Sequence, residues 1–388
     1  MIELESRDII CVGFADWETE LWTNQHHLMV RLARTNRVLF VESLGLRRPT
    51  LARRDLRRIA RRLRQGLGPT RLRDGVHVLS PLVLPFHANR AARAVNARLL
   101  PWLVTRAARR LGFRSPVLWS YVPHAEILVG AVDPSLVVYH CVDDISAHER
   151  IDSADFLAAE QRFASRADLV FASSQPLVDR LRPLAPKVHY MPNVADVGLF
   201  ARALDPGPVD SAVAALPRPR AVFTGAVAAT KVDFAFLAGL ARLRRDWTFA
   251  VVGPVGLGDP LTDVSVLESE PNIRLLGSRC YSELPAVLRE ADVGLIPYAV
   301  NKLTESIFPM KVYEYLAAGL PVIATELPSL DRVEGVVRVG SCEEAAAVLD
   351  TVLLDASVER RKERSRLADG HSWDARLEEI RAAFASLT

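Results

Sequence analysis

Short apolar runs alternate with segments of helical periodicity along nearly all of the 388 residues. This alternation is typical of parallel sheets with helices on both faces, because a helical crossover joins each pair of parallel strands. The predicted strands of the first half are Ile9–Phe14, Val38–Glu42, Val76–Leu79, Val117–Tyr121, Leu136–Cys141, Leu169–Ala172 and Val188–Met191. Those of the second half are Ala221–Thr224, Phe249–Val252, Ile273–Leu276, Val293–Ile296, Val322–Ala324 and Val336–Val339. The predicted fold class is therefore α/β.

Two domains are expected, since 388 residues with 49% apolar content can fill two cores. Residues 201–219 contain four prolines and no strong apolar period, so we predict the linker there. Rossmann-like domains at 1–200 and 220–371 would flank it, with ligands bound beyond the carboxyl ends of their strands. The predicted helices cover residues 23–36, 51–65, 89–111, 154–167, 233–245, 282–290, 309–318 and 342–355.

The first ten residues carry acids where a signal peptide needs a basic region, and no charge-free apolar run reaches 18 residues. A cytoplasmic protein is therefore expected. Its four cysteines lie far apart and form no Cys-x-x-Cys or Cys/His cluster, which argues against a disulfide framework and a structural zinc site.

Positive charge is concentrated near the start of the chain. Residues 1–115 hold 22 arginines against nine acids, and eleven of these arginines lie between Arg47 and Arg73. The pattern predicts a basic amphipathic helix at 51–65, which would bind an anionic membrane surface at the inner face of the cell membrane; a solvated arginine-rich helix is the alternative. No nucleic acid partner is expected, because residues 47–73 lack aromatics. A second basic stretch, Arg90–Arg114, includes Trp102, which suits either a membrane interface or a core.

The segment PMKVYEYLAAGLPVIAT at 309–325 predicts a short helix that Pro309 opens and Gly319 closes. Lys311 and Glu314 lie on one face of it, three residues apart. An ammonium group near a helix N-terminus favours phosphate, and a carboxylate can accept hydrogen bonds from both hydroxyls of a ribose. The pattern indicates a nucleotide-sugar site, or alternatively an ordinary surface ion pair.

The chain resembles the GT-B glycosyltransferases, and among them the large retaining family of bacterial polysaccharide, teichuronic-acid and phosphatidylinositol mannosyltransferases. Besides 309–325, the resemblance rests on DWETELWTNQHHLMVRLA at 16–33, VVYHCVDDISAH at 137–148, PNV at 192–194, TGAVAATK at 224–231, NIRLLG at 272–277 and ADVGLIPY at 291–298. It implies an N-terminal acceptor domain, a C-terminal domain for a nucleoside-diphosphate sugar, and a helix at 372–388 that returns to the first domain.

Several donor-site residues follow from the resemblance. The family's ribose-binding glutamate corresponds to Glu314, while its second glutamate, eight positions earlier, is Ser306 here. Its diphosphate-binding arginine and lysine correspond to Ala226 and Lys231. We hypothesise that Lys311 replaces the missing arginine, because a diphosphate bound without a metal needs more than one cationic partner.

Further candidates come from the loops after strands. Gly225 would let the backbone approach a phosphate, and Tyr298 ends the ADVGLIPY motif beside the donor. In the first domain, Asp143 and Asp144 would orient the acceptor hydroxyl or contact the donor sugar, with a helix cap or loop acid as the alternative. His140 and His124 complete the predicted acceptor-side residues.

These features together predict a retaining glycosyltransferase that uses a nucleoside-diphosphate sugar, needs no metal and no other cofactor, and acts on a lipid-linked or cell-surface glycan. A metal-dependent transferase of the other main fold is disfavoured, because the two acids are adjacent and not spaced as Asp-x-Asp. A dinucleotide oxidoreductase is disfavoured because FADWE, not a glycine-rich loop, follows Gly13. A soluble natural-product glycosyltransferase and a non-catalytic sugar-nucleotide-binding protein remain as alternatives.

Overall fold

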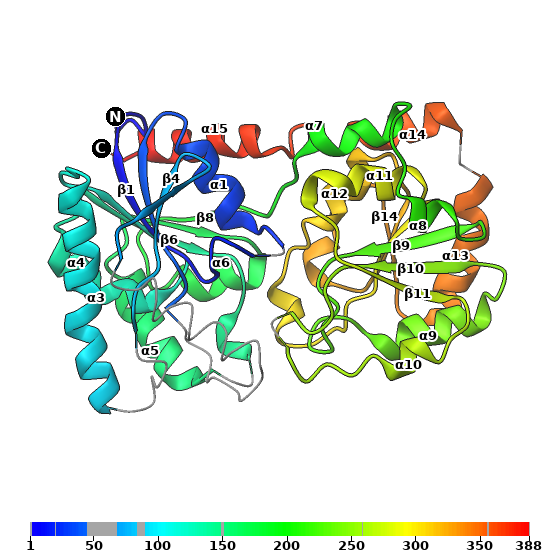
Figure 1. Cartoon of the computed structure of the whole chain (residues 1–388), viewed down its shortest axis with the longest axis horizontal. Coiled ribbons are helices and arrows are strands. Elements are labelled where there is room, and N and C mark those ends of the chain that lie inside the picture. Colours follow the sequence, from blue (N-terminus) through cyan, green and yellow to red (C-terminus); the bar gives the residue numbers. More distant parts are fainter. Residues whose placement is uncertain are drawn as a thin grey trace. The chain divides into compact units, whose positions relative to one another are not determined.

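The computed structural model describes residues 2–19, 21–44, 68–83, 90–148, 151–257, 259–354 and 357–387. The predicted basic helix at 51–65 lies outside these residues. The chain divides into two compact units (Figure 1): Met1–Pro192 with Leu377–Thr388 form the first, and Asn193–Arg376 the second. Each unit is built around its own sheet.

The first unit contains an eight-stranded sheet in the order β3-β4-β2-β1-β5-β6-β7-β8. Its strands are β1 (Asp8–Val12), β2 (Arg37–Val41), β3 (Arg71–Arg73), β4 (Val76–Leu79), β5 (Val117–Ser120), β6 (Leu136–Cys141), β7 (Leu169–Ala172) and β8 (Val188–Tyr190). All neighbours are parallel except the β3–β4 pair at the edge, which is antiparallel. The central strand β1 is fully buried from Ile9 to Val12, as expected for a sheet covered on both faces.

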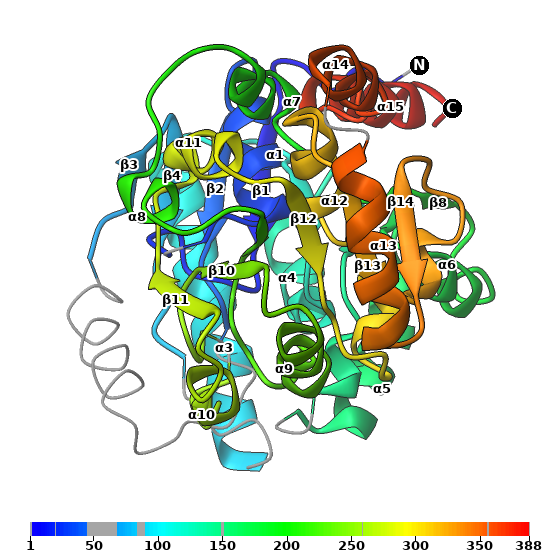
Figure 2. The ribbon, with the colours of Figure 1, turned by 90° about the vertical axis from the view of Figure 1, so that its right-hand side faces the viewer.

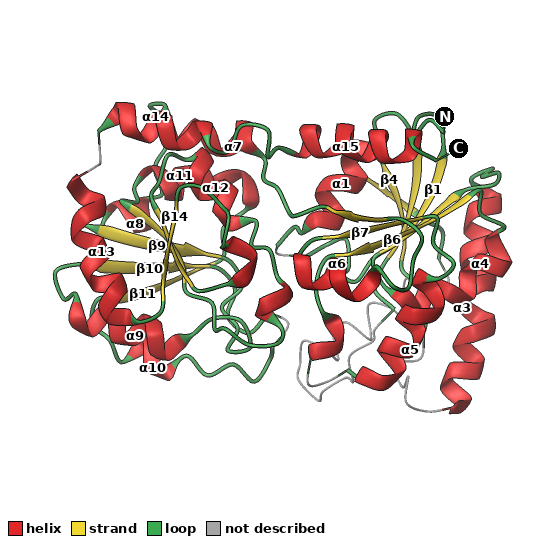
Figure 3. Cartoon of the chain, turned by 180° about the vertical axis from the view of Figure 1, so that it is seen from behind, coloured by secondary structure: helices red, strands yellow, loops and turns green. Residues whose placement is uncertain are grey.

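Helices lie on both faces of this sheet (Figure 3). They are α1 (Asn24–Leu32), α3 (Arg90–Arg110), α4 (Glu126–Val132), α5 (Ser153–Ala164), α6 (Gln175–Leu181) and most of α15 (Trp373–Ala385), with 3-10 turns η1 (Pro123–Ala125) and η2 (Ile145–Ala147). The end of α15 packs on this unit: Trp119 stacks on Phe384 at 6.1 Å between ring centroids, and the Lys187 ammonium donates to the carbonyl of Ser386 over 2.9 Å.

The second unit contains a wholly parallel six-stranded sheet in the order β11-β10-β9-β12-β13-β14, seen from this unit's side in Figure 2. Its strands are β9 (Arg220–Thr224), β10 (Thr248–Val252), β11 (Ile273–Gly277), β12 (Val293–Ile296), β13 (Val322–Thr325) and β14 (Val336–Val339). Its helices are α7 (Val197–Phe200), α8 (Ser211–Ala214), α9 (Phe234–Leu243), α10 (Ser265–Glu268), α11 (Leu284–Arg289), α12 (Lys311–Ala317), α13 (Cys342–Leu354) and α14 (Val358–Arg366).

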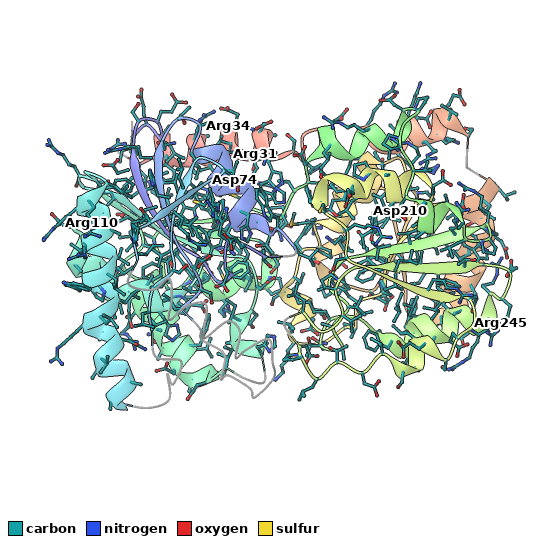
Figure 4. All side chains as sticks on the ribbon, viewed as in Figure 1. Arg31, Arg34, Asp74, Arg110, Asp210 and Arg245 are labelled. Carbon is teal, nitrogen blue, oxygen red and sulfur yellow. The ribbon has the colours of Figure 1, made fainter. Side chains whose placement is uncertain are left out.

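The α/β prediction is confirmed, and every predicted strand is present within one or two residues. The edge strand β3 was not predicted, because its sequence Arg-Leu-Arg has no apolar run. The predicted linker 201–219 lies inside the second unit instead of between the two. Asp210, labelled in Figure 4, caps α8 and pairs with Arg279 at 2.6 Å, so these proline-containing turns are attached to the second sheet.

Candidate functional site

The strand order of the second sheet reverses direction at β9. β9 lies between β10 and β12, and the loops that follow β9 and β12 leave next to each other, which is where doubly wound sheets bind ligands. The two loops are joined by their backbones. Ala299 N–H donates to the Lys231 carbonyl over 2.9 Å, and Val232 pairs with Tyr298 in an antiparallel bridge. Lys231 and Tyr298, predicted from separate motifs, therefore meet at this edge.

Gly225 directly follows β9 with φ +145°, a conformation that other residues rarely adopt. A Cβ atom at this position would lie 3.1 Å from Cε of Lys311 and 3.3 Å from Cζ of Phe223. The aliphatic part of the Lys311 side chain thus lies directly against the glycine backbone. One residue earlier, the Thr224 N–H donates to the Tyr315 hydroxyl over 2.8 Å, which attaches α12 to the end of β9.

The helix α12 carries the charged pair. It begins at Lys311 and not at Pro309 as predicted, because the Pro309 and Met310 carbonyls accept turn-type bonds from Val312 and Tyr313 before the regular ladder starts. Its predicted end is confirmed: Gly319 adopts φ +74°, and Leu320 N–H donates back to the Tyr315 carbonyl over 3.0 Å.

Glu314 and Lys311 form an ion pair with 3.3 Å between Nζ and Oε2. Glu314 is 0% exposed and Lys311 is 18% exposed, so the surface-pair alternative is wrong for the carboxylate. The Tyr281 hydroxyl, located after β11, donates to the other oxygen, Oε1, over 3.4 Å. Burial, followed by the charge of Glu314, raises the pKa of Tyr281, which keeps its hydroxyl protonated as a donor. The buried carboxylate thus has one partner on each oxygen.

Sequence reasoning missed Tyr281. A signal existed, because the residue lies four positions beyond the carboxyl end of β11, at the ligand-binding edge of the sheet. Tyr281 and Glu314 are 33 residues apart in the chain, so no local sequence pattern shows that their side chains are partners.

Two further predicted positions are Ser306 and Lys231. Ser306 is buried in the 3-10 turn η5 (Thr304–Ser306) that leads into α12, while its neighbour Glu305 is exposed. Lys231 is half-buried, and within the described part of the chain no ion pair involves it. In the second unit, the Lys311 side chain therefore contacts both the Gly225 backbone and the Glu314 carboxylate. Backbone hydrogen bonds join the loops that carry Lys231 and Tyr298.

The acids of the first unit are engaged by their own neighbours. Asp144 caps η2 by accepting from Ser146 N–H over 3.2 Å, and it pairs with Arg180 at 2.8 Å. Arg180 also pairs with Glu160 at 3.1 Å, a carboxylate with 1% exposure. The preceding Asp143 is half-buried, and its carbonyl accepts from the Ile145 N–H. This geometry is that of the helix-cap alternative, and the acceptor role of both acids stays a prediction.

The two histidines also contact residues of the first unit. His140 lies inside β6 with 1% exposure, and it stacks on Tyr121 at 4.8 Å between centroids, with Trp119 and Phe171 close by. His124 is in η1 after β5, with Nε2 3.3 Å from Asp155. A ligand contact by either one stays a prediction.

An additional buried histidine lies at the loop after β1. His26 Nδ1 accepts from the Thr23 N–H over 3.2 Å, and Nε2 lies 3.1 Å from the Asp16 carbonyl, to which it donates. Burial lowers the pKa of His26 to about 4, so the ring is neutral at pH 7. Trp17 and Trp22 pack on it.

Comparison with known proteins identifies the second unit. Residues 218–355, which include Gly225, Lys231, Lys311 and Glu314, match the family described as glycosyl transferases group 1. These residues lie within the second unit, and the match covers less than half of the whole chain. A protein of Bacillus subtilis (strain 168) whose name assigns it to teichuronic acid biosynthesis as a glycosyltransferase, TuaH, is 30% identical over 229 residues. The alignment covers 56% of this chain and 57% of TuaH, so the chain matches little more than half of that relative.

Solved structures show that the fold of the whole chain is GT-B. Sucrose-phosphate synthase from Thermosynechococcus elongatus superimposes with a TM-score of 0.68 at 14% identity, covering 98% of this chain and 99% of the synthase. Anabaena Alr3699/HepE in complex with UDP-glucose superimposes with a TM-score of 0.66 at 14% identity, covering 98% and 100%. The residues that match the group 1 family thus lie in the C-terminal half of a GT-B fold.

The described residues contain neither a membrane-spanning helix nor a metal-binding cluster. None of the described helices has both the length and the apolar character needed to cross a membrane. Within the same residues, no three or more His, Cys, Asp or Glu side chains gather in a group that could hold a metal ion.

Proposed function

We propose that this protein is a retaining glycosyltransferase that moves a sugar from a nucleoside-diphosphate sugar to a hydroxyl of a lipid-linked or cell-surface glycan, without a metal. The group 1 match and the TuaH relationship support the reaction class and a glycan of the cell surface. The HepE complexes with UDP and UDP-glucose support a UDP-sugar as the donor class. Retention is what the family resemblance implies.

The buried pair of Glu314 and Lys311 beside Gly225 is the observation that carries this proposal. A carboxylate offers only acceptors, so two vicinal ribose hydroxyls can both donate to it. When they do, the Lys311 ammonium can leave Oε2 and pair with a phosphate oxygen. Its stem already lies against Gly225, where the exposed backbone can approach the same phosphates.

The chemistry then depends on the departing diphosphate. Lys311, together with Lys231 from the adjacent loop, would neutralise the charge that builds on the leaving oxygen, and positioned charges of this kind are worth most when water is excluded. We propose that the same leaving phosphate accepts the proton of the acceptor hydroxyl, so that attack occurs on the face from which the diphosphate leaves. The bond to the acceptor oxygen forms as the bond to the diphosphate oxygen breaks.

The first unit would bind the acceptor, with Asp143, Asp144, His124 and His140 as the predicted contacts. A place on the cytoplasmic face of the membrane, with residues 51–65 on anionic lipid, is part of this proposal. A soluble natural-product acceptor is the second candidate.

Calorimetry with UDP tests the donor site. Loss of a charge-assisted bond of about 1.5–3 kcal/mol predicts that Lys311→Ala weakens UDP binding roughly ten- to a hundredfold. Lys302→Ala is the matched control, since Lys302 is an exposed lysine nine residues earlier. Unchanged affinity in Lys311→Ala would refute the role of this lysine.

Turnover separates the enzyme from a binding protein. Release of UDP from a UDP-sugar, measured with and without EDTA, should proceed equally in both conditions if no metal takes part. A protein that only binds sugar nucleotides would hold UDP in calorimetry and release no sugar.

A further inference from the structure

The outer face of α3 is a surface that the proposed reaction does not use. The helix runs for 21 residues along the outside of the first unit (Figure 1), and one face buries Leu100, Leu103, Val104, Ala107 and Ala108 in the core. On the opposite face Trp102 is 53% exposed and Val95 is 47% exposed. Single exposed apolar side chains are common on protein surfaces, so the feature that distinguishes this face is the charge around its exposed tryptophan.

The exposed tryptophan lies among arginines. Positions 98, 102, 106 and 109 are three or four residues apart, which places Arg98, Trp102, Arg106 and Arg109 along one helix face, with Arg110 beside them. The Arg106 guanidinium lies over the Trp102 ring, 5.3 Å from its centroid. Arg110 is labelled at the outer side of the unit in Figure 4.

An open cavity of about 510 Å³ adjoins this face. Its lining combines an aromatic ring, aliphatic stems and guanidinium groups: Pro101, Trp102, Thr105, Arg106, Arg109, Arg110 and Ala131. A cavity with this lining fits a group that carries negative charge next to apolar chains.

The arginines of this face lack acidic partners. The helix has no Asp or Glu in its sequence, and within the described residues no ion pair involves Arg98, Arg106, Arg109 or Arg110. Other arginines of the unit are paired, such as Arg37 with Asp8 and Arg162 with Glu126. Four uncompensated charges on one helix face favour an anionic partner.

We propose that the outer face of α3 docks on an anionic membrane surface. Trp102 and Val95 would enter the boundary between headgroups and acyl chains, where an aromatic ring with a polar N–H is favoured, and the four arginines would pair with lipid phosphates. A phospholipid surface fits better than nucleic acid, since the face offers a single aromatic ring and no series for stacking bases. The proposal rests on α3 and does not depend on residues 51–65 or on the identity of the transferred sugar.

Tryptophan fluorescence provides a direct test on the full chain. Of the six tryptophans, Trp17, Trp119, Trp247 and Trp373 are buried, Trp22 is half-buried, and only Trp102 is largely exposed. Phosphatidylglycerol vesicles with brominated acyl chains should therefore quench part of the emission, and Trp102→Phe should abolish this quenching. Binding without any quenching of Trp102 would overturn the proposal.

A charge variant tests the arginines. Replacing the four arginines of the face with glutamine, a good helix former, should lower partition onto vesicles of phosphatidylglycerol and phosphatidylcholine by roughly fivefold for each residue. The matched control replaces four exposed cations elsewhere with glutamine: Arg166, Arg182, Arg332 and Lys362. It should retain vesicle binding.

Equal losses in the two variants, or undiminished binding of the α3 variant, would contradict α3 docking. An α3 variant that loses binding to RNA but binds vesicles like the wild type would identify nucleic acid as the partner and also overturn the proposal. Circular dichroism and thermal unfolding of the same variants show whether the fold of the first unit is retained, and calorimetry with UDP reports separately on the proposed donor site in the second unit.

Discussion

The two sheets hold the charged residues at their carboxyl edges in different ways. In the second unit, Lys311 and Glu314 lie one turn apart on one short helix, and Lys311 is partly exposed beside Gly225. In the first unit, Asp144 pairs with Arg180, which also holds the buried Glu160. The arrangement in the second unit leaves a cation that can move to a ligand. The ion pairs in the first unit instead stabilise the fold. Substitutions at the two edges should therefore change different quantities.

The largest effect is expected at Glu314. Glu314→Gln keeps the volume but leaves one acceptor oxygen for two ribose hydroxyls, so UDP affinity should fall about a hundredfold in calorimetry. Glu305→Gln is the matched control, because Glu305 is exposed on the turn before α12. Comparable losses in both variants would show that general electrostatics, and not the buried carboxylate, determines binding.

An effect of similar size, on stability instead of binding, is expected for His26 in acid. Its folded-state pKa of about 4 lies below the usual 6.5, so the unfolded chain takes up the proton first. The contribution of His26 to the free energy of unfolding should be nearly constant above about pH 6.5 and fall by about 3 kcal/mol between pH 6.5 and 4. Urea unfolding at a series of pH values measures this loss.

His26→Gln removes the titrating group and should reduce the fall in the free energy of unfolding between pH 6.5 and 4, whatever its effect on stability at pH 7. UDP affinity of the folded protein at pH 7 should not change. This result would show that His26, in the first unit, affects stability and not donor binding. A pH dependence identical to the wild type would show that His26 is not the group responsible.

The fold could be predicted because its signals are local. Parallel strands buried on both faces are continuous apolar runs, such as Leu136–Cys141, and the sequence marks their bounds. The pair of Lys311 and Glu314 could be predicted for the same reason, since helical spacing alone places both on one face. The end of α12 at Gly319 also followed from a single residue with a positive φ.

Contacts between distant residues could not be predicted. Asp144 and Arg180 are 36 positions apart, and nothing near Asp144 shows that a guanidinium covers it. His140 lies in β6, whose bounds match the predicted strand Leu136–Cys141, but no local pattern showed that aromatic rings from other strands bury its side chain. The linker at 201–219 was misplaced because prolines are also compatible with turns packed on a domain, as the ion pair between Asp210 and Arg279 shows.

A smaller effect is expected at Arg180. Burial raises the pKa of Glu160 although Arg180 opposes it, and Arg180→Gln would raise this pKa further. A raised folded-state pKa means that the folded protein holds the proton more tightly, so stability is lost as the pH rises above the usual carboxyl range. The variant should be less stable by about 2 kcal/mol at pH 7 and by less near pH 4.5, in urea unfolding.

Arg182→Gln is the control for that experiment, because Arg182 is exposed and 3.9 Å from Asp179, a geometry worth little. A loss in Arg180→Gln that does not grow with pH would mean that Glu160 is not the group left unpaired.

The smallest effect is expected at Tyr281. Tyr281→Phe keeps the ring that packs edge-on against Phe200 but removes the donor to Glu314 Oε1, so UDP affinity should fall about fivefold, or about 1 kcal/mol. If the hydroxyl affects UDP binding through the carboxylate, the same substitution should have almost no effect in a Glu314→Gln background. If the two losses add instead, Tyr281 contacts the nucleotide by another route, and the second unit's edge would contain a ligand-binding group independent of the α12 pair.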